Sequence, residues 1–198
     1  YWPKALSQDG LDTFEAFSLP LVKAPTGKTL LTIHDIRGVR AQAGLLQRAA
    51  NKVFLERSLR GADHVITVSE SMKNEILGVF PSLSISVVYN GLDTHGFDTV
   101  FEIDKQEVRR KYALPAEFML AVGHLERHKN YLRLVDAMAR LRDQGRSCSL
   151  LIVGNDRGEL KKIKKRINAA NLSGCVKILS GLSDFEVRCL YKMCNLFV

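Results

Sequence analysis

Short apolar runs alternate along the chain with longer segments in which apolar residues recur every three or four positions. Strands buried on both faces read as near-continuous apolar runs, whereas amphipathic helices show the wider spacing. The alternation therefore predicts βαβ units, with helices covering parallel sheets. The predicted strands are residues 29–33, 64–68, 85–89, 118–122, 149–153, 176–179 and 196–198.

Two segments carry the signature of a capping box, in which a side chain at the helix start and a carboxylate three residues later satisfy each other's amides. Ser183 and Glu186 form the first pair. Asp104 and Glu107 match the same spacing and predict a second helix that starts at Asp104. A further helix is expected to end at Gly145, because glycine tolerates the left-handed backbone that closes many helices.

The helix expected after Gly158 combines an apolar face with a basic one. Leu160, Ile163 and Ile167 are spaced to face a sheet. The other side of the helix is cationic, with Lys161, Lys162, Lys164, Lys165 and Arg166. Such a face is most simply solvated, but it also suits contact with an anionic membrane surface.

Turn-forming residues cluster at residues 90–98, between a predicted strand and a predicted helix. This break divides the chain into residues 1–95 and residues 96–198. Each part is predicted to be a portion of an α/β domain with a doubly wound parallel sheet. The chain does not begin with Met and it stops within a predicted strand, so we expect it to be a piece of a longer protein.

The net charge of +8 permits three kinds of partner: nucleic acid, anionic lipid or a phosphorylated ligand. Nucleic acid is disfavoured, because the basic residues lack the interleaved aromatic side chains of a base-stacking surface. No apolar run approaches the length that spans a bilayer. The four cysteines lack the spacing of a zinc site, which favours free thiols.

Ligands of parallel sheets bind outside the carboxyl ends of the strands. Gly123 follows one predicted strand, and Arg127, His128 and Lys129 gather just before the next helix. Cations beside the free amides of a helix start suit a diphosphate. A basic loop that binds nothing explains the same residues, so the residues alone leave both interpretations open.

Three further loops leave the choice between ligand binding and ordinary turn chemistry open as well. His34 and Asp35 directly follow a predicted strand, where an imidazole could act as an acid or base. Gly154 follows a second strand, and Gly181 with Leu182 follows a third. Glycine at such places allows close approach to the main chain.

Taken in order, six segments resemble glycosyltransferase family 4, whose members have the GT-B fold of two Rossmann-like domains. They are Thr32-Ile33-His34-Asp35, residues 62–71, Asn90-Gly91-Leu92-Asp93, residues 123–130, Leu151-Ile152-Val153-Gly154 and residues 178–184. The resemblance covers residues 28–198. It implies an acceptor-side domain at residues 1–95 and a donor-side domain at residues 96–198.

The resemblance also implies roles for single residues. Lys129 matches the lysine that contacts the donor diphosphate, whereas His128 stands where many members carry arginine and Arg127 where proline is common. Gly123 and Gly154 each match a loop that binds the nucleotide in the family. The main chain at Gly181 and Leu182 would approach the base. His34 matches a catalytic-cleft histidine, with Asp35 on the acceptor side and Asn90 at the hinge.

The implied reaction is transfer of a sugar, with retention of configuration, from a nucleoside diphosphate sugar to a polysaccharide or a lipid-linked glycan. It implies no metal or other cofactor and a cytoplasmic protein, with peripheral contact to the inner face of the membrane as a further option. The start of the phosphate loop is similar to members that use GDP-mannose. A pair of glutamates is expected beyond Val198, so residues 1–198 alone should be inactive. A nucleotide-sugar epimerase and a non-catalytic binding module with the same fold remain alternatives.

Overall fold

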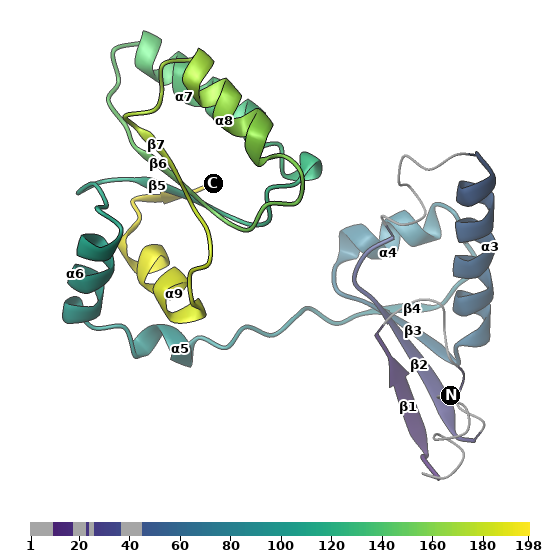
Figure 1. The fold of residues 1–198 in the computed structure, drawn as a ribbon. Coiled ribbons are helices and arrows are strands. Elements are labelled where there is room, and N and C mark those ends of the chain that lie inside the picture. The colour runs from purple at the N-terminus through teal and green to yellow at the C-terminus, as the bar shows by residue number, and fades with distance from the viewer. Residues whose placement is uncertain (1–9, 18–22, 24–25, 37–44) are drawn as a thin grey trace. The chain divides into compact units, whose positions relative to one another are not determined.

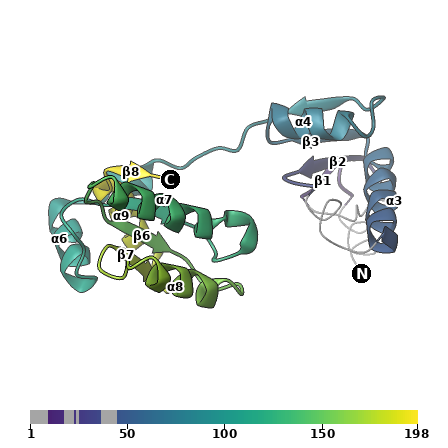
Figure 2. The same cartoon turned by 90° about the horizontal axis from the view of Figure 1, so that it is seen from above.

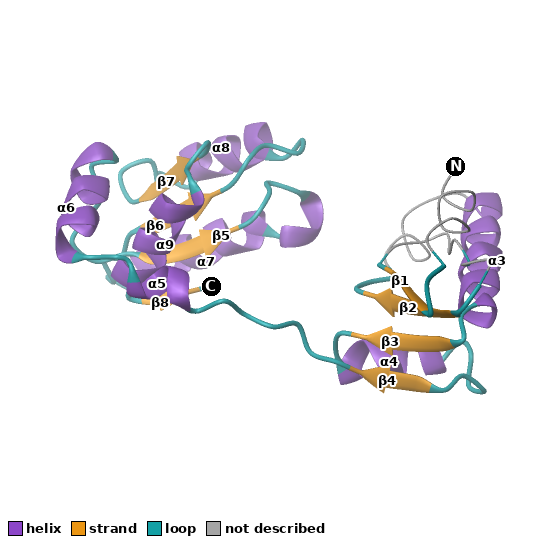
Figure 3. Ribbon diagram, turned by 90° about the horizontal axis from the view of Figure 1, so that it is seen from below, coloured by secondary structure: helices purple, strands orange, loops and turns teal. Residues whose placement is uncertain are grey.

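The structure is a computed structural model that describes residues 10–17, 23, 26–36 and 45–198. The chain forms two compact units, Tyr1–Leu92 and Asp93–Val198. Each unit holds a four-stranded sheet whose described strands all pair in parallel (Figure 3). The two parallel sheets flanked by helices confirm the predicted α/β class.

In the first unit the strand order is β1-β2-β3-β4. The strands are β1 (Thr13–Ala16), β2 (Lys28–Ile33), β3 (His64–Thr67) and β4 (Ile85–Val87), and the helices are α3 (Leu45–Gly61) and α4 (Glu70–Leu77). The core joins β2 to both helices through Leu31, Leu55 and Ile76. Ser69 caps α4, because its hydroxyl accepts a hydrogen bond from the Met72 amide at 3.1 Å.

The second unit has the strand order β7-β6-β5-β8. Its strands are β5 (Met119–Val122), β6 (Leu150–Val153), β7 (Val176–Leu179) and β8 (Leu196–Phe197). Its helices are α5 (His95–Asp98), α6 (Glu102–Lys111), the 3-10 turn η1 (Arg127–Lys129), α7 (Tyr131–Asp143), α8 (Leu160–Ala169) and α9 (Asp184–Met193).

Helices cover both faces of the second sheet, as its apolar strands require (Figures 1 and 2). Leu150 and Ile152 of β6 pack in one cluster with residues of α7 and α8. Leu151 and Val153 alternate with them and pack in the other cluster, with residues of α6 and α9. Since successive side chains of a strand point to opposite faces, one four-residue strand holds the two helix layers together.

The seven predicted strands are all present, with ends that differ by at most two residues. The amphipathic assignment of α8 is also confirmed, since Ile163 and Ile167 are buried and the five cations lie on the exposed side. The helix α7 is followed by Gly145 in the left-handed region at φ +74°, as predicted. The sequence missed β1, an edge strand without an apolar run.

The helix start predicted at Asp104 is wrong. Helix α6 begins at Glu102, and Asp104 is its third residue. The Asp104 carboxylate reaches back to accept a hydrogen bond from the Phe101 amide at 2.8 Å. Asp104 is thus the carboxylate at the third helical position of a capping box, and the cap residue is Phe101.

Glu186 ties α9 to α6. Its carboxylate accepts hydrogen bonds from Lys111 Nζ at 2.6 Å, the Tyr112 hydroxyl at 2.8 Å and the Ser183 amide at 2.8 Å. The Ser183 hydroxyl caps the Glu186 amide at 3.2 Å, which confirms the predicted capping box. The Lys111 ammonium and then the Ser183 amide lower the pKa of Glu186 to about 2.

Because the folded state lowers this pKa, Glu186 stabilises the fold above its ordinary pKa of 4.5, and the stabilisation is lost as the pH falls from there towards 2. Glu186→Gln should lower the free energy of unfolding by about 1 kcal/mol at pH 7. The difference in the free energy of unfolding between Glu186→Gln and the wild type should become smaller as the pH falls from 4.5 to 2. Urea denaturation at several pH values measures it, with Glu117→Gln as the exposed control. A gap that is constant with pH would contradict this role.

Candidate functional site

Three loops of the second unit lie at the carboxyl ends of neighbouring parallel strands. They connect β5 to α7, β6 to α8 and β7 to α9. Each leads into the start of a helix, where backbone amides lack partners within the helix and attract anions. A helix start whose amides already donate to a side chain has little room for an anion, whereas a helix start without such a side chain can accept one.

The starts of α8 and α9 are occupied by the protein's own side chains. The Asp156 carboxylate accepts hydrogen bonds from the amides of Gly158 at 2.8 Å, Glu159 at 3.1 Å and Leu160 at 3.1 Å. These backbone contacts lower the pKa of Asp156. Ser183 caps α9 as described above. An anion at either helix would have to displace a carboxylate or a hydroxyl.

The start of α7 differs, because no side chain caps it. Its preceding residue, Asn130, lies in the left-handed region with φ +56° and ψ +34° and joins η1 to α7. The basic residues Arg127, His128 and Lys129 are those of η1 itself, and all three are exposed. The structure thus places the predicted cations next to the one uncapped helix start of these three loops.

The β5–α7 loop is anchored by Leu125, whose side chain is buried in the core. The Leu125 amide donates to the Asn155 carbonyl at 2.9 Å, and the Leu125 carbonyl accepts from the amides of Arg157 at 3.2 Å and Glu159 at 3.3 Å. The loop after β5 is therefore joined along its backbone to the loop after β6.

Gly154 makes this junction possible. A β-carbon at Gly154 would overlap the carbonyl oxygen of Gly123 and lie 3.3 Å from the His124 amide nitrogen. Both neighbours are backbone atoms, so they could not move aside as a flexible side chain does. The structure thus gives Gly154 a packing role in addition to the expected role at the nucleotide, which stays a prediction.

Gly123 is held from two sides. Its amide donates to the Val153 carbonyl at 2.9 Å, and its carbonyl accepts a hydrogen bond from the Tyr131 hydroxyl at 2.9 Å. At φ +153° it has a conformation that other residues rarely adopt. The stem of Lys129 also packs here, since a β-carbon at Gly123 would lie 3.5 Å from Lys129 Cε.

The charges of η1 are not equivalent. His128 Nδ1 lies 3.1 Å from the Glu126 carboxylate. Lys129, in contrast, extends its stem along Gly123 and is exposed. Lys129 is thus the residue of the three whose side-chain stem is known to lie beside Gly123, at the end of β5.

The loop after β7 exposes its backbone at Gly181. Gly181 has φ +71°, and a β-carbon there would meet no atom within 4 Å. The half-buried Leu182 packs against the core cluster of α6 and α9. Its side chain is thus committed to the core, and the exposed backbone at Gly181 is what this loop presents.

The remaining predicted residues belong to the first unit. His34 and Asp35 directly follow β2, and both are exposed. Asn90 is exposed in the segment that follows β4. The structure therefore groups Gly123, Lys129, Gly154 and Gly181 on one edge of the second sheet, whereas His34, Asp35 and Asn90 lie in a separate unit.

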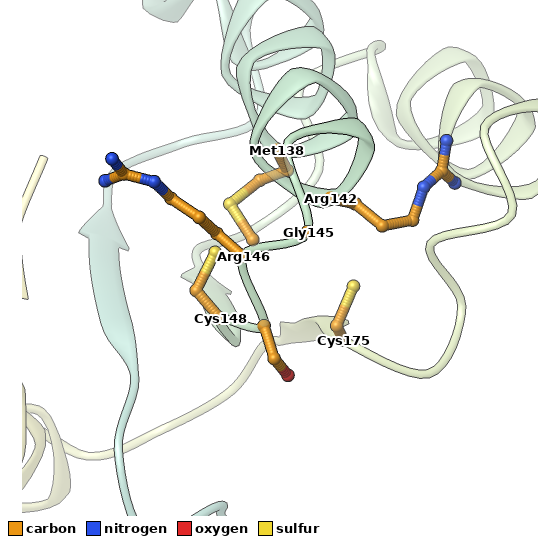
Figure 4. A pocket seen from close by; sticks show the side chains of 7 residues that line it. Met138, Arg142, Gly145, Arg146, Cys148 and Cys175 are labelled. Carbon is orange, nitrogen blue, oxygen red and sulfur yellow. The ribbon is translucent and has the colours of Figure 1, made fainter.

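A hollow of about 340 Å³ occupies the opposite edge of the second sheet, at the amino ends of β6 and β7 (Figure 4). Its lining includes Arg142, Arg146, Cys148 and Cys175. The Arg142 guanidinium is engaged, because it pairs with Asp143 at 2.7 Å and donates to the Ala170 carbonyl. The hollow therefore lies at the opposite edge of the sheet from the three loops at the carboxyl ends of the strands.

Among the described residues, no three His, Cys, Asp or Glu side chains gather to hold a metal ion. The absence of a metal in the reaction remains a prediction. Within the same part of the chain, every helix is too short or too polar to cross a bilayer.

Two family models match the chain, one on each side of the segment that joins the units. The model of glycosyltransferase family 4 matches residues 12–95. The model of the glycosyl transferases group 1 matches residues 104–198. The chain belongs to the group 1 glycosyltransferases. This confirms the family that the six sequence segments indicated.

Curated relatives of this group 1 glycosyltransferase include mannosyltransferases. The O-antigen chain mannosyltransferase RfbU of Salmonella typhimurium is 27% identical over 177 residues, covering 88% of this chain and 45% of RfbU. The serotype-specific mannosyltransferase WbdA of Escherichia coli is 26% identical over 191 residues, covering 91% of this chain and 23% of WbdA. The chain therefore spans less than half the length of these relatives.

Solved structures show the same fold. A glycosyltransferase from Rickettsia africae has a TM-score of 0.74 at 21% identity, over 99% of this chain and 53% of that one. HepE of Anabaena, in complex with UDP, has a TM-score of 0.73 at 19% identity, over 98% of this chain and 54% of that one. The group 1 glycosyltransferase described here thus has the GT-B architecture.

Proposed function

We propose that this group 1 glycosyltransferase transfers a sugar from a nucleoside diphosphate sugar to a hydroxyl of a glycan or a lipid-linked glycan, with retention of configuration. GDP-mannose is the donor that we propose first. The second unit would bind the donor, and the first unit, with His34 and Asp35, would face the acceptor.

The observation that carries the proposal is the uncapped start of α7 beside the exposed cations of η1. The diphosphate is the charged part of such a donor, and its charge grows as it leaves. Backbone amides at a helix start and a fixed ammonium group stabilise that growing charge without a metal. The side chains that cap α8 and α9 make those two helix starts less suitable.

The chemistry is a substitution at the anomeric carbon of the donor. The bond from that carbon to the diphosphate oxygen breaks, a bond to the acceptor oxygen forms, and the proton of the acceptor hydroxyl passes to the departing diphosphate. Lys129 and the amides at the start of α7 would meet the negative charge on the departing diphosphate. His34 is the residue proposed near the reacting sugar, in keeping with its place directly after β2.

The choice of sugar is supported by the relatives. RfbU and WbdA are both named as mannosyltransferases, and a third relative is the mannosylfructose-phosphate synthase of Agrobacterium fabrum, 25% identical over 121 residues. HepE, a neighbour in fold, binds UDP and UDP-glucose, so UDP-sugars form the comparison set. Contact of the basic face of α8 with an anionic membrane remains a prediction.

The test uses the protein expressed from its entire gene. It is incubated with GDP-mannose or UDP-glucose, with and without lipid-linked glycan acceptors, and the products are followed by NMR. We expect mannose transfer that requires the acceptor and keeps the anomeric configuration. Formation of an isomer of the donor without acceptor would instead indicate an epimerase. Release of no product from any donor would contradict the transferase proposal.

A further inference from the structure

The Tyr131 hydroxyl is buried at the strand end and points at the backbone of the proposed phosphate loop. Tyr131 is the first residue of α7, and only 5% of it is exposed. The hydroxyl donates to the Gly123 carbonyl at 2.9 Å. Burial raises the pKa of Tyr131, which keeps the phenol protonated as the donor of this bond.

The bond fixes the direction of the peptide that joins Gly123 to His124. A trans peptide is planar, so its carbonyl and its amide N–H point in opposite directions. The amides on either side are used, since Gly123 donates to Val153 and Leu125 donates to Asn155, both at 2.9 Å. Within the described residues the His124 amide has no backbone acceptor, so holding the Gly123 carbonyl orients an amide that no other backbone group engages.

The same glycine also positions Lys129. Its stem lies beside Gly123, where a β-carbon would be 3.5 Å from Lys129 Cε and 3.1 Å from the Tyr131 hydroxyl. The hydroxyl and the lysine stem therefore both lie beside the Gly123 backbone, and the hydroxyl is bonded to it. A shift of the Gly123 peptide would displace both the His124 amide and the lysine.

We propose that Tyr131 is a positioning residue for the donor diphosphate. Its hydroxyl holds the Gly123 carbonyl, and thereby directs the His124 amide and the Lys129 ammonium towards the phosphates. The inference rests on the proposed function, and it adds a residue that contacts neither the donor nor the acceptor.

The test measures binding of GDP and UDP to the full-length protein, with guanosine and uridine as comparators that lack phosphate. The nucleotide that binds the wild type is used for the variants. Tyr131→Phe keeps the ring and removes the hydroxyl. We expect the Kd of the nucleoside diphosphate to rise about 3- to 10-fold, the range for one hydrogen bond, while the Kd of the nucleoside stays unchanged.

Tyr112→Phe is the matched control, because it removes a hydroxyl bond to Glu186 in the same unit. We expect it to lower the Tm and to leave the ratio of the two Kd values unchanged. A purely structural role of Tyr131 would likewise change the Tm alone. Lys129→Ala tests the proposed donor site separately from the proposed role of Tyr131.

If Lys129→Ala raises the Kd of the nucleoside diphosphate and Tyr131→Phe does not, the role of Tyr131 is overturned and the donor site stands. If neither nucleotide binds the wild type, or Lys129→Ala binds as the wild type does, the proposed donor site is overturned and the role of Tyr131 with it.

Discussion

Replacing Gly154 with alanine is expected to lower the Tm of the second unit by roughly 10 °C. The added methyl group would overlap the Gly123 carbonyl, so the loops after β5 and β6 must separate. Forced overpacking of this kind costs about 1–3 kcal/mol, and each kcal/mol shifts the Tm of a unit of about 100 residues by several degrees. Thermal unfolding followed by circular dichroism measures the change.

Gly174→Ala is the control for this substitution, since a β-carbon at Gly174 meets no atom within 4 Å. Its Tm should remain within about 2 °C of the wild type. The displaced loop should also weaken nucleotide binding in Gly154→Ala but not in Gly174→Ala. Equal Tm values for the two variants would show that the junction of the loops does not hold the second unit together.

The second large effect is expected for Lys129→Ala, which should lower kcat/KM for the donor about 10- to 100-fold. A hydrogen bond to a charged group contributes roughly 1.5–3 kcal/mol, and this one would act where negative charge develops. The measurement is steady-state sugar transfer by the full-length protein with GDP-mannose as the varied substrate.

Lys192→Ala provides the comparison, because Lys192 is an exposed cation in the last turn of α9, in the same unit. It should change kcat/KM less than twofold, which separates a local contact from the general effect of net charge. A change below twofold for Lys129→Ala would remove Lys129 from the donor site.

The sequence predicted most of the fold because its buried strands and amphipathic helices have strong periodic patterns. Leu150–Val153, which is buried throughout, and the amphipathic helix α8 are of this kind. It missed β1, because an edge strand needs no apolar run. It misplaced the start of α6, because a carboxylate can lie at the cap or at the third residue of a helix, and only the structure shows which.

The candidate site was harder to predict, because its geometry depends on contacts between loops. The position of Lys129 after a strand was visible in the sequence. The overlap that forces glycine at position 154, the anchor at Leu125 and the hydroxyl bond of Tyr131 were not, since each joins residues of different segments. A capping signal at Asp156, ahead of Gly158 and α8, could have been found from the sequence.

The most direct test of the account is a crystal structure of the full-length protein with a bound nucleoside diphosphate. The account predicts the diphosphate within hydrogen-bond distance of Lys129 Nζ and of backbone amides between Gly123 and Tyr131. A diphosphate bound at the start of α8 or α9, or in the hollow beside Cys148 and Cys175, would contradict it.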